Sequence, residues 1–575
     1  QPVIVLLADR GDQYHYVVVT GVAGDAIVVH DPSWGPSRMV KIQRFTQLWS
    51  ASGNWGLVVL PADRAGASPV RTTPDFPDSP GVSDAAESGS ADPCEVSVAR
   101  AVEEVRSRGL GHGDDILEPL RARCSDSPAF MRELAGLRFA QKQWRESETL
   151  AQAVVLRAPH DSYASDLLGA ARFMQGDSVG ALRAWNAIEK PRLDLVRISG
   201  LTRSRYQTII DAIGLQSAVL LTADAFVRAQ HRVEELPDRS SSRLSLRPGG
   251  DGFASVDVAI TERSGLPRSY SEWAALGIRA AVERDVAVAV PGFTGEGDIW
   301  SAAWRWYSNR PRVALAFAAP RVGELPGVWR VEGSWEAETY ASGPASLRES
   351  RTHGALTVSD WILPNVRYSL SGGIDSWDTS RTAASFGGTL ERRLFADFLA
   401  VEGNATTWIP LGKGNADVGF NALGIGAQAR TRSPRDWGYD IGAGAAWVSD
   451  AAPLSIWSGA GEGRARPNLL RAHPLLDNGV IDARGSSTFG RTLRYGNAEG
   501  QRWLSRPSLV RIGIAAFVDV AQATRRLATS DGPVQTDIGG GLRFRIPGAQ
   551  GMLRVDAAHG LRDGANAITI GWMIR

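Results

Sequence analysis

The stretch that decides the fold is the end of the chain, Ala567–Arg575, with the sequence AITIGWMIR. Its large apolar residues Ile568, Ile570, Trp572 and Ile574 stand at every second position. Successive side chains of a β-strand point to opposite faces, so the stretch predicts a strand with one strongly apolar face. A terminal strand of this kind is typical of a membrane β-barrel, whose last strand closes against the first.

The same alternation recurs upstream, from about residue 268 onward. In WRVEGSWEAE (329–338), Trp329, Val331 and Trp335 share one face, and mainly charged residues share the other. A barrel accommodates both faces, because lipid surrounds it and its lumen can hold water. The length suits roughly sixteen strands at about ten residues per strand plus turns. Alternation alone also fits a tryptophan-rich soluble β-sandwich, which stays open as an alternative.

Composition limits the classes of function. The chain has 575 residues, and its 63 basic and 62 acidic side chains give a net charge of +1. Such a balance offers no field to gather nucleic acid, so we expect no nucleic-acid partner. No window of about 18 apolar residues predicts a membrane helix. The chain opens at Gln1 within an apolar, strand-like run, so we expect a processed or truncated fragment.

The first part of the chain predicts a small domain followed by a linker. Within residues 1–62, β-branched runs alternate with glycine and proline turns, as in a small sheet. Residues 63–92 are rich in Pro, Ser, Ala, Asp and Gly and have almost no large apolar side chain. Such a segment cannot offset its ordering entropy by burial, so a disordered linker is expected there.

Residues 93–192 have a helical pattern with a 34-residue repeat. Leu134, Ala135, Arg138 and Phe139 recur as Leu168, Gly169, Arg172 and Phe173. This period resembles the tetratricopeptide repeat, which implies a scaffold or a peptide-binding surface. A plain array of helical hairpins remains the alternative, with nearly the same architecture.

Residues 193–264 predict the order strand (195–198), helix (203–213), helix (222–235), strand (243–247) and strand (254–262). With GLTRSRY at 200–206 and VDVAITER at 256–263, this unit resembles a polypeptide-transport-associated (POTRA) domain. In that family an exposed strand edge can accept an extended client segment by β-augmentation. A simple spacer ahead of the barrel is the alternative.

Residues 265–575 are expected to form the barrel. AAFVDVAQA (515–523), DIGGGLRFRIP (537–547) and MLRVDAAHGL (552–561) resemble the last strands of the surface-antigen barrel superfamily, which includes outer-membrane assembly factors and two-partner secretion transporters. That family has an inward loop with an arginine motif, and Leu470–His473 is the nearest candidate here. Asp519 and Asp556 are expected to be lumen charges rather than catalytic carboxylates.

The first domain contains a candidate catalytic pair. YHYVVV at 14–19 and VVHDP at 28–32 resemble the second half of the bacteriocin-processing, papain-like cysteine peptidases. The resemblance implies that His15 is the general base and Asp31 its orienting carboxylate. A histidine buried for structural reasons is the alternative. In that family the nucleophilic cysteine lies upstream, so either it lies in a missing N-terminal half or the domain is a peptide-binding relic.

The chain has only two cysteines, Cys94 and Cys124, and the sequence leaves open whether they pair or remain free thiols. The eight histidines lack metal-ligand spacing, and the glycine pairs are not followed by helices, so no metal or cofactor is expected. The sequence thus predicts a multidomain protein with a papain-like α+β fragment, helical repeats, a small α+β domain and a transmembrane antiparallel β-barrel.

Two functions follow from these patterns. The first is a bacterial outer-membrane protein with periplasmic N-terminal domains that transports or assembles polypeptide clients, with outer-membrane lipid as its other partner. The second is a membrane-anchored cysteine peptidase whose cysteine lies in a missing N-terminal segment. A third possibility is a closed anchor that carries a docking scaffold.

Overall fold

In the computed structural model the chain forms two compact units. One consists of Gln1–Ser199, Leu215–Phe226 and Leu244–Val258, and the other of Gly200–Gly214, Val227–Arg243 and Ala259–Arg575. The structure describes residues 3–8, 14–31, 35–58, 93–249, 252–267, 269–321, 323, 325–378, 381–412, 418–431, 436–461, 466, 468–504, 510–528, 530–546, 549 and 551–573. The linker expected at 63–92 lies outside these residues.

The N-terminal segment forms a five-stranded sheet in the order β4-β3-β2-β1-β5. The strands are β1 (Val3–Ala8), β2 (Tyr14–Ala23), β3 (Ala26–Asp31), β4 (Gly35–Lys41) and β5 (Gly56–Val58). A helix that the strand pattern did not predict, α1 (Ile42–Ser50), packs Phe45 into a core with Val5, Leu7, Val17 and Val29. Val5 and Leu7 of β1 are buried in this core while the residues between them are less buried, as expected for a strand with one face packed on a core.

The next segment is helical. It contains α2 (Pro93–Arg108), η1 (Leu110–His112), α3 (Gly113–Leu117), η2 (Glu118–Leu120), α4 (Arg121–Cys124), α5 (Pro128–Ala140), α6 (Trp144–Arg157), α7 (Ser162–Met174) and α8 (Ser178–Asn186). Asp161 and Asp177 cap α7 and α8 by accepting hydrogen bonds from backbone N–H groups. Cys94 and Cys124 form a disulfide, which decides between the two alternatives that the sequence left open.

Small residues let these helices approach closely. A Cβ at Gly169 of α7 would lie 2.3 Å from the indole nitrogen of Trp185 in α8, so only glycine fits there. Ala135, Ala151 and Leu168 are buried together in one core. Within the described residues, no helix is both long enough and apolar enough to cross a membrane.

A three-stranded sheet follows, in the order β6-β8-β7, with two helices. The elements are β6 (Arg192–Ser199), α9 (Tyr206–Ile213), α10 (Ala223–Glu234), β7 (Arg239–Pro248) and β8 (Phe253–Glu262). Their order agrees with the strand-helix-helix-strand-strand pattern expected from the sequence. Gly200 has a φ of 88°, and a Cβ there would lie 2.0 Å from the carbonyl oxygen of Ile260, which explains the glycine at this turn.

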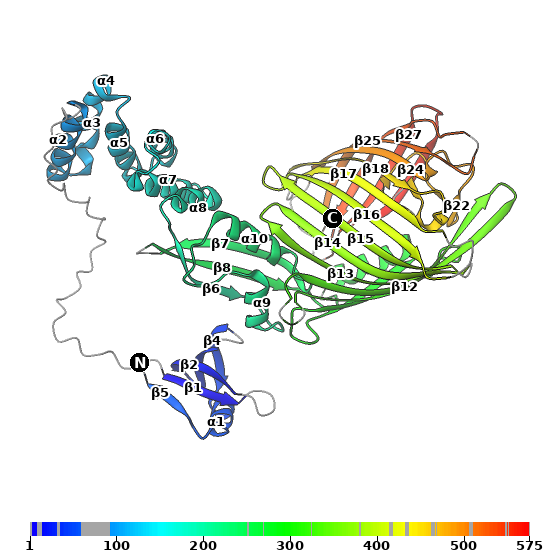
Figure 1. Cartoon of the computed structure of the whole chain (residues 1–575), viewed down its shortest axis with the longest axis horizontal. Coiled ribbons are helices and arrows are strands. Elements are labelled where there is room, and N and C mark those ends of the chain that lie inside the picture. Colours follow the sequence, from blue (N-terminus) through cyan, green and yellow to red (C-terminus); the bar gives the residue numbers. More distant parts are fainter. Residues whose placement is uncertain are drawn as a thin grey trace. The chain divides into compact units, whose positions relative to one another are not determined.

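The remaining strands form a closed antiparallel barrel (Figure 1). Its strands are β9 (Asp285–Pro291), β10 (Ile299–Arg305), β11 (Arg312–Ala319), β12 (Val328–Ser342), β13 (Ala345–Leu363), β14 (Val366–Trp377), β15 (Arg381–Leu394), β16 (Leu399–Pro410), β17 (Phe420–Arg430), β18 (Trp437–Val448), β24 (Thr492–Trp503), β25 (Arg511–Thr524), β26 (Gln535–Arg545), β27 (Met552–Gly560) and β28 (Asn566–Met573). The chain end AITIGWMIR supplies β28, except for Ile574 and Arg575, which lie outside the described residues.

The strand ring also includes β21 (Leu476–Asp477) and β22 (Val480–Asp482), which gives seventeen strands among the described residues where roughly sixteen were expected. These two short strands belong to the long connection between β18 and β24, and β22 pairs in parallel with β12. The same connection contains η3 (Leu454–Ile456), β19 (Ser458–Gly461), β20 (Asn468–Leu469) and β23 (Phe489–Gly490). The number of strands therefore depends on a loop that adds to the barrel wall.

One part of the expected barrel region is not a strand. Residues Tyr270–Glu283 form helix α11, and the first barrel strand begins at Asp285. The Ser269 hydroxyl accepts a hydrogen bond from the backbone N–H of Glu272, which starts the helix. A serine three residues before a glutamate is a known helix-start pattern, and the residues that follow favour helix. This local signal overrides the two-residue alternation expected there.

Large apolar side chains cover the outside of the barrel. These residues are exposed, and they alternate along the strands with residues that face inward. Representative members are Val288, Trp300, Leu315, Val331, Trp335, Leu356, Ile374, Phe386, Leu423, Ile425, Ile441, Ile514, Ile538, Leu542, Ile568 and Ile570. Buried charged side chains such as Arg471, Asp519 and Arg543 occur on the inner side, so the barrel is apolar outside and in large part polar inside.

Candidate functional site

His15 and Asp31 lie together on neighbouring strands of the N-terminal sheet. His15 is on β2 and Asp31 is the last residue of β3, and the His15 Nε2 atom lies 3.2 Å from the Asp31 Oδ2 atom. The Asp31 side chain is buried, whereas about a fifth of the His15 side chain is exposed. With Nε2 directed at the carboxylate, the proton-transfer role of a thiol-activating base would fall to Nδ1, an atom that is buried here.

Arg38 is a further member of this group that the sequence did not indicate. Its Nη1 atom on β4 lies 3.1 Å from the same Asp31 oxygen. A guanidinium at this distance favours the ionised carboxylate, which is the form that orients a histidine. Neither Cys94 nor Cys124 is a free thiol, because both belong to the disulfide. The predicted roles of His15 and Asp31 therefore stay predictions that depend on a thiol from elsewhere.

A second group of polar residues lies inside the barrel, around the connection between β18 and β24. We call residues 449–491 the inward loop. Its Arg471 guanidinium contacts three buried carboxylates, at 2.9 Å from Glu499, 3.2 Å from Asp519 and 3.5 Å from Asp556. Arg471 is 1% exposed, so the loop carries a charged side chain into the barrel wall. The arginine expected in Leu470–His473 thus occupies an inward position.

Two arginines of the barrel wall complete this charged cluster. Arg543 on β26 contacts Glu499 at 2.7 Å and Asp556 at 2.6 Å, and Arg554 on β27 contacts Asp556 at 2.7 Å. Three guanidinium groups therefore share three carboxylates, and each buried charge has a partner of opposite sign, as burial demands. Asp519 and Asp556 are lumen charges in ion pairs, as the sequence-based interpretation expected.

His473 extends the contact of the inward loop with the wall. Its Nδ1 atom lies 2.8 Å from Asp537 on β26, and its Nε2 atom lies 2.9 Å from Asp563 in the turn before β28. The backbone N–H of Ala472 donates to the other oxygen of Asp537 at 2.6 Å. Because both the main chain and two side chains of the loop are bound, the segment 471–473 has one defined position on the C-terminal strands.

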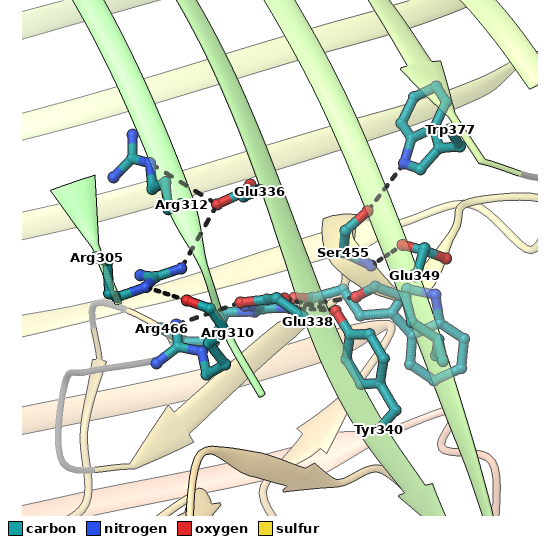
Figure 2. Close-up of polar contacts among 12 residues, drawn as sticks. Arg305, Arg310, Arg312, Glu336, Glu338, Tyr340, Glu349, Trp377, Ser455 and Arg466 are labelled. Carbon is teal, nitrogen blue, oxygen red and sulfur yellow. Dashed lines mark hydrogen bonds and ion pairs between the residues drawn. The ribbon is translucent and has the colours of Figure 1, made fainter. Parts of the chain in front are cut away.

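The opposite side of the barrel binds the same loop (Figure 2). Arg466 lies 3.2 Å from Glu338 of β12, and Arg310, in the turn before β11, lies 3.3 Å from the same carboxylate. The Tyr340 hydroxyl donates to Glu338 at 2.6 Å. The backbone N–H of Ser455 donates to Glu349 of β13 at 2.9 Å. The inward loop therefore spans the lumen and is bound on both sides.

Apolar packing accompanies these polar contacts. Tyr340, Trp377, Trp408, Phe420, Trp457, Leu475, Ile481 and Phe489 belong to one buried cluster that joins the inward loop to strands β12, β14, β16 and β17. The Trp408 and Phe420 rings stack with centroids 4.7 Å apart. Beside this cluster, the lumen contains a cavity of about 800 Å³, lined by Asn404, Gln428, Tyr495, Asn497 and Trp457 among others. A polar chamber therefore lies beside the loop.

The β6-β8-β7 domain contains a third polar group, centred on Glu262 of β8. Its carboxylate accepts hydrogen bonds from the backbone N–H groups of Arg203 and Ser204, at 3.0 and 2.9 Å, and from the Thr202 hydroxyl. Burial raises the pKa of Glu262, but these hydrogen bonds outweigh burial and hold the pKa below its usual value. Glu262 therefore joins the GLTRSRY and VDVAITER segments and has a structural role.

Comparisons with known proteins give two results. Residues 1–60 match the model of the Peptidase C39 family. Among solved structures, the chain is similar to BamA from Haemophilus ducreyi lacking POTRA domains 1–3, with a TM-score of 0.39 and 13% identity over 66% of this chain and 83% of that one. It is also similar to CdiB from Escherichia coli, with a TM-score of 0.44 and 14% identity over 67% of this chain and 76% of that one.

CdiB from Acinetobacter baumannii is a further similar structure, with a TM-score of 0.41 and 10% identity over 74% of this chain and 80% of that one. No curated protein sequence matches the chain.

Proposed function

We propose that this chain is an outer-membrane β-barrel protein that transports or assembles polypeptides, and that the domains before the barrel lie in the periplasm. The observation that carries the proposal is the distribution of side chains in the closed barrel. Large apolar side chains such as Leu356, Ile425 and Ile568 face outward, while Arg471 and Asp519 are enclosed. A continuous apolar exterior around a polar interior is stable against lipid and unstable against water.

The same distribution argues against a soluble β-sandwich. A sandwich in water would bury Leu356 and Ile425, yet these side chains are 46% and 61% exposed. Closure of the sheet also pairs the strand edges, which lipid requires because it cannot hydrogen-bond to backbone groups. The barrel is therefore best explained as a membrane-spanning domain.

Three features support polypeptides as the cargo or client. The helices α5–α8 form an array of hairpins of the kind that binds peptides. Strand β7 lies at one edge of the β6-β8-β7 sheet, where an extended segment could add a strand. The last barrel strands contain the three segments that resemble polypeptide-handling surface-antigen barrels. Together they favour a client-binding region followed by a barrel.

Membrane insertion can be tested with the full chain refolded into phosphatidylcholine vesicles. We expect a band whose gel mobility changes on boiling and a barrel fragment, beginning near Asp285, that resists protease. Recovery of the folded chain in the vesicle-free supernatant, with the barrel region open to protease, would disprove a membrane-spanning barrel.

Client binding can be tested with a photoreactive amino acid in place of Ser242 on β7. A synthetic peptide of alternating valine and threonine, which favours an extended strand, is the probe. We expect crosslinking at position 242 and little at Gln216, an exposed position in the segment between α9 and α10. Equal crosslinking at the two positions would argue against strand addition at β7.

A barrel-anchored cysteine peptidase is the second candidate, and the contact between His15 and Asp31 favours it. A protein that combines this chain with a cysteine-bearing segment should cleave a fluorogenic peptide. His15→Ala should then lower kcat/KM at least a hundredfold, the usual loss with a general base. Asp31→Asn should act in the same direction, and Lys41→Ala, at the end of β4, serves as the control. Unchanged cleavage in both site variants would leave the domain a binding module.

A further inference from the structure

Helix α10 presents one row of polar side chains to the barrel. Arg228, His231, Arg232 and Glu235 are spaced by three, one and three residues, so they share a single helical face. The backbone N–H of Glu235 still bonds to the carbonyl of His231, which continues the helical turn past Glu234. All four belong to the same compact unit as the barrel.

Each member of this row has a partner at the strand ends of the barrel. Arg232 forms a bidentate pair with Asp360 of β13, at 2.8 and 2.6 Å. Glu235 pairs with Arg367 of β14 at 2.8 Å. The Arg228 guanidinium donates to the carbonyl oxygen of Ile362 at 3.2 Å.

His231 makes the most enclosed of these contacts. It is 2% exposed, stacks on Trp361 with ring centroids 4.0 Å apart, and places its Nε2 atom 2.9 Å from the Asp397 carboxylate. The guanidinium of Arg393 lies 4.6 Å from the Trp361 ring centroid. His231 therefore connects α10 to the turn between β15 and β16.

That turn has an unusual backbone. Phe395, Ala396 and Asp397 have φ values of 53°, 52° and 66°, so three successive residues that are not glycine adopt the left-handed conformation. L-residues avoid this region because Cβ crowds the following carbonyl, and such conformations persist only where surrounding contacts hold them. Asp397, the third of these residues, is the one that His231 binds.

The turn also borders the lumen. Arg393 and Asp397 both line the cavity of about 800 Å³ inside the barrel. A change in the turn would therefore change the rim of this cavity, because the two residues occupy its wall.

We propose that α10 is a latch that holds the turn 395–398 in a high-energy conformation through His231, and that detachment of α10 lets the turn relax and reshapes the rim of the lumen cavity. The other members of the row set the position of α10, and the contact of His231 with Asp397 reaches the turn. Strain in a turn and a contact that maintains it are the two parts that a conformational switch needs.

Hydrogen exchange of the full chain tests this latch. The Phe398 amide donates to Phe395 and the Arg430 amide donates to Phe398, so both amides report on the turn. In His231→Ala we expect both to exchange about tenfold faster, the factor that corresponds to roughly 1.4 kcal/mol. The Leu411 amide, which donates to Thr382, should not change and serves as the internal control.

Arg228→Ala is the matched control variant, because Arg228 lies on the same face but contacts the Ile362 carbonyl rather than the turn. We expect less than a twofold change at Phe398 in that variant. Asp397→Asn, which keeps the shape of the side chain, provides a second measurement if His231→Ala does not fold, with an increase of several-fold expected. Equal exchange in His231→Ala, Asp397→Asn and the parent chain would overturn the latch.

Substitution of Ala396 by glycine tests whether the backbone of the turn is strained or is only held in place by its contacts. Glycine adopts the left-handed conformation at little cost, so Ala396→Gly should let the turn keep its shape without His231. In the His231→Ala background we therefore expect Ala396→Gly to slow exchange at Phe398 to within about threefold of the parent chain. Faster exchange in the double variant would show added flexibility without strain and would overturn the proposal.

Discussion

Arg138 in the helical region and Arg471 in the barrel each contact three carboxylates, but their surroundings differ. The side chains of Asp114, Glu118 and Glu146 around Arg138 are 48%, 33% and 47% exposed. Those of Glu499, Asp519 and Asp556 around Arg471 are at most 2% exposed. Water can replace Arg138 for its exposed partners, whereas Asp519 is fully enclosed and pairs with Arg471. An arginine among three carboxylates is therefore dispensable for stability in the helical region and required in the barrel.

Replacement of each arginine by alanine should give the largest difference in lost stability between the two regions. Arg471→Ala removes the arginine that Asp519, a fully buried carboxylate, pairs with, and should lower the free energy of unfolding of the barrel by about 3–5 kcal/mol. Arg138→Ala should cost the helical region about 1 kcal/mol or less, because its partners are solvated. Urea unfolding of the full chain in detergent micelles, followed by tryptophan fluorescence for the barrel and helical circular dichroism, measures both. Similar losses in the two variants would remove the distinction.

Removal of the disulfide should affect only the helical region. Cys94 and Cys124 lie 30 residues apart and join α2 to α4, whereas the barrel closes through strand pairing alone. With both cysteines replaced by serine, the helices should lose about 3.6 kcal/mol, as expected for a loop of this length. Circular dichroism at 222 nm during thermal unfolding measures the loss. An equal shift of the barrel transition would mean that the regions unfold as one.

A charge added to the surface tests which solvent each region faces. Ile425→Arg, on the outside of β17, should destabilise the barrel in vesicles by about 2 kcal/mol. Leu156→Arg is the matched control, because Leu156 is 74% exposed on α6 and should tolerate charge with a change below about 0.5 kcal/mol. Equilibrium refolding into phosphatidylcholine vesicles gives both values. A neutral Ile425→Arg would indicate that water surrounds that face.

The smallest expected effect concerns acid. The hydrogen bond from Arg138 holds the pKa of Asp114 below its usual 3.8, and that from Arg121 holds the pKa of Glu118 below its usual 4.5. A carboxyl with a depressed folded pKa stabilises the fold above its unfolded pKa, and this stability is lost as pH falls through the folded value. The melting temperature of the helical region should therefore decrease below about pH 4.5. Arg138→Ala should reduce this dependence, and an unchanged pH profile in that variant would contradict the assignment.

Much of the local structure follows from short-range patterns in the sequence. Alternation in 329–338 and in 567–573 predicts strands because one face must meet an apolar medium and the other a polar one. The 34-residue spacing of Leu134 and Leu168 predicts stacked helices. In the structure Leu134 lies in α5 and Leu168 lies in α7. The missed helix α11 shows the limit, since a Ser-x-x-Glu start was present but was outweighed by the expectation of strands.

The candidate sites depended more on tertiary contacts. The sequence resemblance singled out His15 and Asp31, and the sheet places them 3.2 Å apart, but Arg38 carried no motif and was missed. Arg466 and Glu338 are 128 residues apart in the chain, and no local pattern connects them. The contact between His231 and Asp397 spans 166 residues and was invisible for the same reason.

The sequence by itself therefore determined the kind of each element, because side-chain periodicity, caps and turn residues act over a few neighbouring positions. Only the tertiary structure decided the disulfide between Cys94 and Cys124, the path of the inward loop across the lumen and the left-handed turn at 395–397. The physical reason is that buried charges and strained backbone are stable only with partners from distant segments. Folding alone brings those partners together.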